Sequence, residues 1–273
     1  MKNFLSFDLE FWHSGEPYSN HLPKKIMNNI EEDVRPLLNI LKKHNTTATF
    51  FTLGNLAEKY PDLIKEIHEN GHEIASHGYS HKRLYELGPD NFEREIKKSI
   101  NLIKSITNIT PIGFRAPYYS LTNSTIWALS ILTKYNFKYD SSILPVTSHL
   151  QSDSNPPRIP YKISMDDVTK VDEHSKLCEF PLCSIRFLYN IPFSIGVYLR
   201  IFPFGIYKMI IKKNNKRGPI TFCIHPWECN PKTSRLNLFL PLYFCSYYGI
   251  RLTLKKIDKL LKEFDFVSIK EVI

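Results

Sequence analysis

The chain has 273 residues, of which 42% are hydrophobic and 23% charged, a balance that excludes an intrinsically disordered protein; its length allows one large domain, such as an α/β barrel, or two small ones. Its 36 Lys and Arg residues exceed its 27 Asp and Glu residues, and the net charge of +9 favours anionic partners or a membrane surface. No recognition motif indicates a nucleic-acid-binding protein.

Three further features bear on location. The five cysteines show no C-x-x-C spacing, which favours reduced thiols in the cytoplasm. Asp8 and Glu10 interrupt the N-terminal sequence before the apolar core of a signal peptide forms, so we expect no export by a standard signal. The most apolar stretch, residues 187–211, contains prolines, glycines and an arginine. It is therefore expected to be an irregular loop that lines a pocket or dips into a lipid surface, not a spanning helix.

The first half of the sequence alternates between predicted strands and helices. A short strand over residues 4–7 leads to Asp8 and Glu10, and a helix is predicted over 31–44 with Pro36 near its first turn. The elements that follow are strands over 47–53, 72–77 and 112–115, and helices over 61–69, 92–106 and 125–134. This order predicts a parallel sheet with crossover helices.

The second half is less regular. A polar, Pro-rich excursion is expected over residues 141–176, inside the domain and not as a linker. Strands are predicted over 177–182 and 220–225, a final helix over 253–264, and a closing strand over 266–269. We therefore expect a single domain over residues 1–273.

Ionisable residues follow the ends of several predicted strands. In parallel α/β folds, active sites are built where the carboxyl ends of the strands meet. His77 and His81 are four residues apart with the flexible Gly78 between them, which lets both imidazoles face one divalent cation. The full set at this edge is Asp8, Glu10, His77, His81, Arg115 and His225.

These motifs resemble the polysaccharide deacetylases with the NodB homology domain, carbohydrate esterase family 4. The resemblance is strongest to the cytoplasmic branch found in exopolysaccharide and exosortase loci. It covers nearly the whole chain, with a branch-specific part over residues 226–273. The segments that carry it are 6–10, 77–81, 114–118, 179–181, 191–194 and 224–228. It implies a distorted (β/α)7-type barrel and metal-dependent removal of an N-acetyl group from an amino sugar in cell-surface polysaccharide biosynthesis.

The metal ligands follow from this resemblance and from the chemistry of amide hydrolysis. His77 and His81 supply two ligands, and the third is an oxygen donor from Glu10 or Asp8. The commonest family pattern has two adjacent aspartates, but Leu9 occupies the second position here. We assign Glu10 to the metal and Asp8 to the water as general base, with exchange of the two, or loss of the metal, as alternatives. Zn²⁺ fits the donor set, and Co²⁺, Ni²⁺ or Mn²⁺ bind the same ligands.

Other residues are assigned to the reaction and to its substrate. Arg115 is expected to hold Asp8 by a charged hydrogen bond and to lower its pKa. The backbone N–H of Tyr118, placed by Pro117, is assigned to the developing oxyanion. Pro117 is also assigned to the substrate-binding surface.

His225 is assigned as general acid to the departing amine, supported by Glu179 or Glu228. Trp12 and Trp227 are interpreted as stacking walls for a sugar ring, with a place in the core as the alternative.

The expected partner is an acetylated amino sugar, nucleotide-linked or lipid-linked, met in the cytoplasm or at the inner face of the membrane. Three rival functions stay open: a hydrolase of a non-sugar amide or cyclic imide, a glycan-binding protein whose metal site has decayed at Leu9, and a membrane-associated assembly scaffold. The sequence does not indicate the sugar or the oligomeric state.

Overall fold

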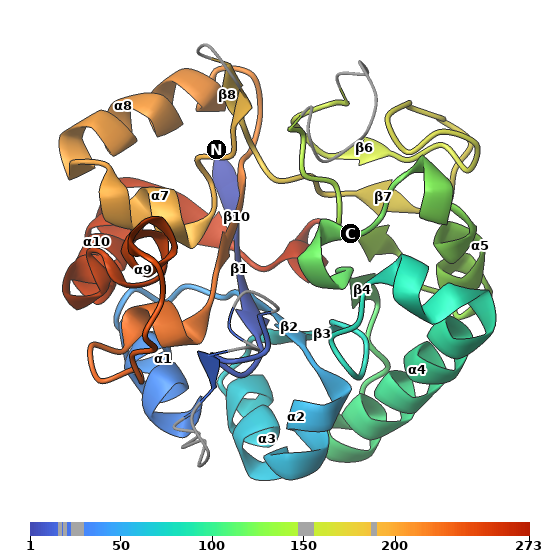
Figure 1. The fold of residues 1–273 in the computed structure, drawn as a ribbon. Helices are drawn as coiled ribbons and strands as arrows, with labels where there is room; N and C mark the ends of the chain where they lie inside the picture. The colour runs from blue at the N-terminus through green and yellow to red at the C-terminus, as the bar shows by residue number, and fades with distance from the viewer. Residues whose placement is uncertain (16–17, 19–20, 23–29, 147–155, 187–189) are drawn as a thin grey trace.

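A curled, mostly parallel β-sheet forms the centre of the molecule (Figure 1). The structure is a computed structural model that describes residues 1–15, 18, 21–22, 30–146, 156–186 and 190–273. Within these residues the main sheet has the strand order β10-β1-β2-β3-β4-β5-β7-β6, and β11 also pairs with β1. Its strands are β1 (Lys2–Leu9), β2 (Thr49–Thr52), β3 (Glu73–Ser76), β4 (Gly113–Phe114), β5 (Tyr139–Asp140), β6 (Tyr161–Lys162), β7 (Cys178–Glu179), β10 (Thr221–Ile224) and β11 (Asp265–Val267).

The strand pairings explain the curled shape. Neighbouring strands run parallel throughout the path except at β6 and β7, which are antiparallel. Two isolated parallel bridges, one between Leu182 and Thr221 and one between Ile195 and Cys223, bring the chain after β7 back to β10. The sheet therefore curls toward a barrel, which confirms the predicted α/β fold class. A separate antiparallel pair is formed by β8 (Ile185–Arg186) and β9 (Asn190–Ile191).

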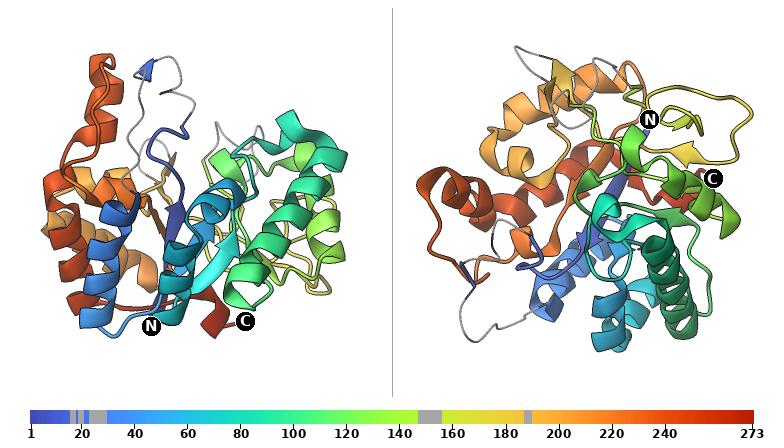
Figure 2. Two further views of the ribbon diagram at one scale, coloured as in Figure 1. Left: turned by 90° about the horizontal axis from the view of Figure 1, so that it is seen from below. Right: turned by 45° about the vertical axis from the view of Figure 1, so that its right-hand side comes forward.

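Helices surround the sheet on the outside (Figures 1 and 2). Their bounds are α1 (Ile30–Lys43), α2 (Gly54–Lys59), α3 (Pro61–Glu69), α4 (Leu84–Thr107), α5 (Trp127–Lys134), α7 (Gly196–Ile201), α8 (Phe204–Asn215), α9 (Leu240–Tyr247) and α10 (Ile250–Glu263). In the described part of the chain, no helix combines the length and the apolar character needed to cross a lipid bilayer.

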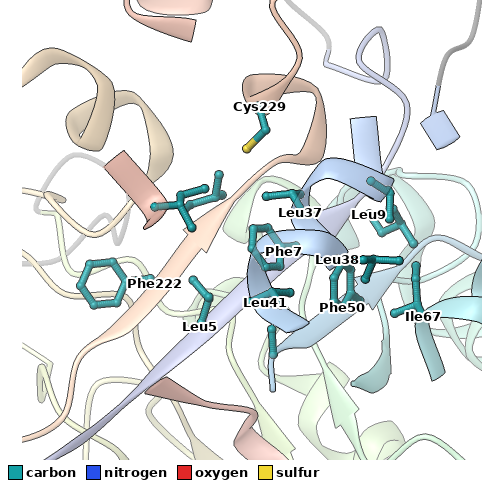
Figure 3. Close-up of a cluster of buried hydrophobic side chains, with 14 of the residues drawn as sticks. Leu5, Phe7, Leu9, Leu37, Leu38, Leu41, Phe50, Ile67, Phe222 and Cys229 are labelled. Atoms are coloured by element: carbon teal, nitrogen blue, oxygen red, sulfur yellow. The ribbon is translucent and has the colours of Figure 1, made fainter. Parts of the chain in front are cut away.

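The packing of α1 on β1 shows how the sequence pattern produces the core. Leu37, Leu38 and Leu41 recur at helical spacing and are buried, while acidic residues occupy the first turn of α1 and lysines the last, which suits the helix dipole. Figure 3 shows these leucines facing Phe7 and its neighbours on β1. Seven of the eight residues of β1 are buried, as expected for a strand at the centre of a parallel sheet.

Two expectations about local structure are wrong. The described part of the 187–211 stretch contains β9, α7 and most of α8, and is not an irregular loop; residues 187–189 lie outside the described residues. Tyr207 and Ile211 of α8 are buried, so this stretch is apolar because it packs against the core. Pro36 is not in the first turn of α1, which begins at Ile30.

Several predicted elements are present with shifted bounds. The helix predicted over 92–106 begins at Leu84 and includes a break at Gly88, whose φ of 68° lies in the left-handed region. The 141–176 excursion contains β6, and its residues 147–155 lie outside the described part. The helix α9 was not predicted.

Candidate active site and metal centre

The ionisable residues that follow β1, β3, β4 and β10 lie together at one edge of the sheet. The parallel register pairs Phe7 of β1 with Ile224 of β10, and Thr52 of β2 with Ser76 of β3. The residues just beyond these strand ends are therefore neighbours, as the predicted topology requires.

Glu10, His77 and His81 form one group. Glu10 Oε2 lies 2.5 Å from His81 Nε2 and 3.9 Å from His77 Nε2, and at most 8% of each of the three side chains is exposed. One ligand atom from each residue lies within 4.8 Å of the other two. The structure thus brings together the three side chains that the sequence analysis assigned to a metal.

The backbone orients both imidazoles. Nδ1 of His77 lies 2.8 Å from the carbonyl oxygen of Arg115, and Nδ1 of His81 lies 3.2 Å from that of Ser14. A carbonyl oxygen only accepts hydrogen bonds, so each Nδ1 is a protonated nitrogen, and each Nε2 is the ring nitrogen that faces Glu10. Burial and the nearby His81 lower the pKa of His77 to about 4, although Asp8 and Glu10 act against this, and His77 is therefore neutral as a ligand must be.

A side chain of helix α4 fixes the turn between the two histidines. Glu95 of α4 accepts hydrogen bonds from the backbone N–H groups of Tyr79 and Ser80, both at 3.1 Å. Gly78 has φ 74° and His81 has φ 63°, a conformation that a non-glycine residue adopts only when its surroundings impose it. Glu95 was not identified from the sequence, because its spacing is that of an ordinary helix surface.

Asp8 is held by Arg115. Arg115 Nη1 donates to Asp8 Oδ1 at 2.7 Å and to Ser6 Oγ at 2.9 Å, and both charged side chains are buried. Nε and Nη2 of Arg115 donate to the carbonyl and the hydroxyl of Ser141. Burial alone would raise the pKa of Asp8, but the charges of Arg115, His77 and His225 and the hydrogen bond from Arg115 together outweigh burial and hold this pKa well below its usual value. Asp8 is thus an ionised carboxylate at neutral pH.

A second group of candidate ligands, Asp8, Cys223 and His225, lies next to the first. A thiol binds a metal as its thiolate, and burial, together with the charge of Asp8, raises the pKa of Cys223 well above its usual value. Asp8 is already paired with Arg115. The group of Glu10 with the two histidines therefore fits a divalent cation better.

His225 is supported by Glu228, one of the two carboxylates considered from the sequence. His225 Nδ1 lies 2.7 Å from Glu228 Oε1, and Arg200 Nε donates to Glu228 Oε2 at 2.8 Å. Burial by itself lowers the pKa of His225, but the hydrogen bond that it donates to Glu228 and the charges of Glu10 and Glu228 raise it to about 9. A Cβ added at Gly196 would lie 2.3 Å from Glu228, so a glycine there leaves room for the carboxylate.

Arg200 was not identified as a site residue. Its guanidinium is buried and also donates to the backbone carbonyls of Cys245, Ser246 and Tyr248. The sequence offered one signal for its role. Arg200 and Lys208 are the two charged residues in the apolar stretch 187–211. A charged residue in such a stretch is usually paired when it is buried.

Glu179, the other carboxylate considered for His225, lies elsewhere. It is buried together with Asp140 in the sheet layer that carries Arg115, and Ile143 N donates to its Oε1 at 3.0 Å. Asp140 accepts hydrogen bonds from the backbone N–H and the hydroxyl of Ser142. Burial raises the pKa of both carboxyl groups, so the pair retains a proton that separate carboxylates would release.

Pro117 and Tyr118 form a tight 3-10 turn directly after β4. Tyr118 has φ 56° and ψ 19°, its hydroxyl donates to the carbonyl of Ser14, and its ring centroid is 4.6 Å from that of His81. The turn borders the group formed by Glu10, His77 and His81. The assignment of the Tyr118 N–H to an oxyanion stays a prediction.

Trp12 and Trp227 lie in a shared apolar cluster, with only 6% and 7% of each residue exposed. The ring of Trp227 stacks on His225 at 5.7 Å between centroids. Their contact with a sugar stays a prediction, since the structure places most of each indole in the core.

Comparison with known proteins agrees with this geometry. Residues 26–139 match the family model of the polysaccharide deacetylases, and residues 141–273 match a model described as a domain of unknown function, DUF3473. Residues 26–139 therefore carry a polysaccharide deacetylase domain, which confirms the family named from the motifs. The finer placement in a cytoplasmic branch stays a prediction.

Two curated relatives are similar over the same part of the chain. A peptidoglycan deacetylase of Helicobacter pylori is 35% identical over 114 residues, and a peptidoglycan-N-acetylglucosamine deacetylase of Bacillus cereus is 38% identical over 102 residues. The matched stretches cover 42% and 37% of this chain, and 38% and 36% of those two relatives.

Solved structures share the fold over nearly the whole chain. A candidate polysaccharide deacetylase from Mycobacterium smegmatis has a TM-score of 0.60 at 18% identity, covering 100% of this chain and 90% of the other. A family 4 pseudoenzyme from Bacillus anthracis has a TM-score of 0.52 at 13% identity, covering 99% and 65%. At such identities the likeness describes the fold alone.

Proposed function

We propose that this protein is a metal-dependent N-deacetylase of an acetylated amino sugar. The observation that carries the proposal is the juxtaposition of three units: the Glu10, His77 and His81 group, the Asp8–Arg115 pair, and His225 with Glu228. His225 Nε2 lies 3.5 Å from Glu10 Oε1, so the three units face one small volume. The named deacetylase relatives support the same reaction.

The donor set fits a divalent cation. Two imidazoles and one carboxylate, all buried, match the three-ligand catalytic zinc sites that keep one position open. Co²⁺, Ni²⁺ and Mn²⁺ bind the same donors. When bound, the metal polarises the acetyl carbonyl and lowers the pKa of a water molecule.

The chain supplies the proton transfers. Asp8 is ionised and oriented by Arg115, so it takes the proton of the attacking water as general base. His225 carries a proton below pH 9 and gives it to the nitrogen of the departing amine. The backbone N–H of Tyr118 is proposed to bind the oxyanion.

We also propose a precursor as the substrate and the cytoplasm as the location. The net charge of +9 suits the phosphates of a nucleotide-linked or lipid-linked sugar. Recovery of the native protein only from the periplasm or the culture medium would overturn the location.

The experiment that tests the function combines acetate release with metal analysis. The purified protein is loaded with Zn²⁺, Co²⁺, Ni²⁺ or Mn²⁺ and assayed on acetylated sugar nucleotides and lipid-linked sugars. Asp8→Asn is expected to retain about one metal ion per chain but to lose at least about a hundredfold in kcat. Glu10→Gln is expected to lose the metal as well as the activity. If Asp8→Asn instead loses the metal and Glu10→Gln retains it, then Asp8 is the metal ligand and Glu10 the general base.

A second candidate function is that of a glycan-binding protein without turnover. The B. anthracis pseudoenzyme shows that this fold is also found in a protein described as inactive. Sugar binding with neither acetate release nor stoichiometric metal would favour this function. Turnover of small amides or cyclic imides alone would favour a non-sugar hydrolase.

A further inference from the structure

Helix α9 and its flanks present a large apolar surface to the solvent. The side chains that form this surface, here called the α9 face, belong to Phe239, Leu240, Tyr243, Phe244, Tyr248 and Leu252, with exposed fractions from 36% to 83%. In the left view of Figure 2, α9 stands at the edge of the molecule. Contiguous exposed apolar side chains of this kind are uncommon on a protein surface unless something binds there.

The composition of α9 rules out an ordinary amphipathic surface helix. Residues 240–247 include no charged side chain, and only Ser246 and Tyr247 are buried by the rest of the chain. A helix that is apolar around most of its circumference is normally covered. The hydroxyl of Tyr18 contacts Ser246 at 3.0 Å, which fixes one side of α9 to the body and leaves the rest outward.

The chain segment that carries the α9 face is basic. Residues 229–257 contain five cationic side chains and no Asp or Glu; the cations are Lys232, Arg235, Arg251, Lys255 and Lys256. A surface cavity of about 570 Å³ opens where α9 meets α10. Arg235, Arg251 and Lys256 line it together with Tyr247 and Tyr248, and among the residues that the structure describes no acidic one does.

We propose that the α9 face docks onto an anionic phospholipid bilayer, with the basic cavity beside it facing lipid phosphates. Exposed aromatic and leucine side chains next to cations are the features of proteins that lie in the membrane interface. A second copy of the chain is the less favourable occupant. A two-fold interface would set two cationic faces against each other.

Docking at this place has a consequence for the site, and this step goes beyond the proposed hydrolysis. The carbonyls of Cys245, Ser246 and Tyr248, at the end of α9, accept hydrogen bonds from Arg200, which also holds Glu228. The membrane surface would thus lie against the element that positions His225.

The test is co-sedimentation of the full chain with vesicles, which needs no turnover and so is independent of the proposed reaction. We expect binding to phosphatidylcholine vesicles containing phosphatidylglycerol, weak binding to pure phosphatidylcholine, and loss of binding as salt is raised. Arg251→Gln is expected to weaken binding about fivefold, and Leu240→Ser by about tenfold.

Matched controls come from the opposite side of the molecule. Arg94→Gln on α4 and Ile109→Ser after α4 remove an exposed arginine and an exposed aliphatic residue there, and both are expected to bind like the wild type. Circular dichroism establishes that each variant is folded, and Phe244→Ser replaces Leu240→Ser if the latter is not.

Three outcomes would overturn the proposal. The first is equal binding to vesicles with and without phosphatidylglycerol, and the second is equal loss in the α9 and control variants. The third is a dimer in solution that Leu240→Ser dissociates, with no vesicle binding, because the α9 face would then cover a second copy of the chain.

Discussion

At the scale of single residues, two buried arginines set the electrostatics of the site. Arg115 holds Asp8 and Arg200 holds Glu228, each through a hydrogen-bonded ion pair shorter than 3 Å. Each arginine also donates to backbone or hydroxyl oxygens, which satisfies further N–H groups of its guanidinium. The two carboxylates therefore stay ionised although they are buried.

The protonation of His225 depends on this arrangement and predicts the pH profile. The pKa of His225 is raised to about 9, so the general acid is protonated below that pH, and kcat/KM should fall as pH rises through about 9. Glu228→Gln removes the negative charge and should move this alkaline limb down by about one unit or more.

The measurement is kcat/KM against pH, with Glu66→Gln on the exposed surface of α3 as control. Since Glu228→Gln also leaves Arg200 without its partner, thermal unfolding must show that the variant is folded. An alkaline limb that stays in place in the folded variant would exclude His225 as the acid.

At the scale of elements, the apolar stretch before β10 packs as helices. Tyr207 of α8 lies in the core and donates from its hydroxyl to the carbonyl of Phe193 at 2.9 Å. A run of apolar residues broken by Pro and Gly has the same sequence pattern whether it forms a buried loop or a pair of short buried helices. Only the residues that pack against it decide which of the two structures forms.

Mutations in α8 test this packing. Ile211→Ala leaves a cavity in the core and should lower the free energy of unfolding by about 2–5 kcal/mol. Met209→Ala on the exposed side of the same helix should change it by less than about 0.5 kcal/mol. Urea unfolding measures both, and equal small effects would show that α8 does not pack as described.

At the scale of the whole molecule, the site joins parts of the chain that are far apart in sequence. The deacetylase family match contains His77, His81 and Arg115, whereas Asp8 and Glu10 precede it and His225 follows in the second match. Strand β1 pairs with β2 from one part and with β10 and β11 from the other. That the whole chain folds as one domain stays a prediction.

The Asp140–Glu179 pair makes the stability of this sheet depend on pH. The pKa values of both carboxyl groups are raised by burial, so the folded chain keeps a proton that the unfolded chain releases above about pH 4.5. The contribution of the pair is complete at low pH, and it falls by about 1.4 kcal/mol per pH unit as pH rises.

Glu179→Gln carries no such proton. The difference in Tm between Glu179→Gln and the wild type should therefore shift in favour of the variant as pH is raised from about 5 to about 8. The reason is that only the wild type loses stability by keeping the shared proton. The exposed Glu66→Gln serves again as control. Parallel Tm curves for wild type and Glu179→Gln would contradict the shared proton.

The sequence by itself determined the alternation of strands and helices, the family, and the residue types at the strand ends. These are local signals, because periodicity, turn residues and motif spacing are read along the chain. The topology then followed, since consecutive βα units form parallel sheets with right-handed crossovers.

Only the tertiary structure decided which groups touch. It placed Glu10 beside the histidines and Asp8 beside Arg115, chose Glu228 over Glu179 as the partner of His225, and brought in Arg200. It also turned the α9 face outward. Such pairings depend on how strands far apart in sequence are brought together, and no pattern along the chain encodes the distance between two side chains once the sheet has curled.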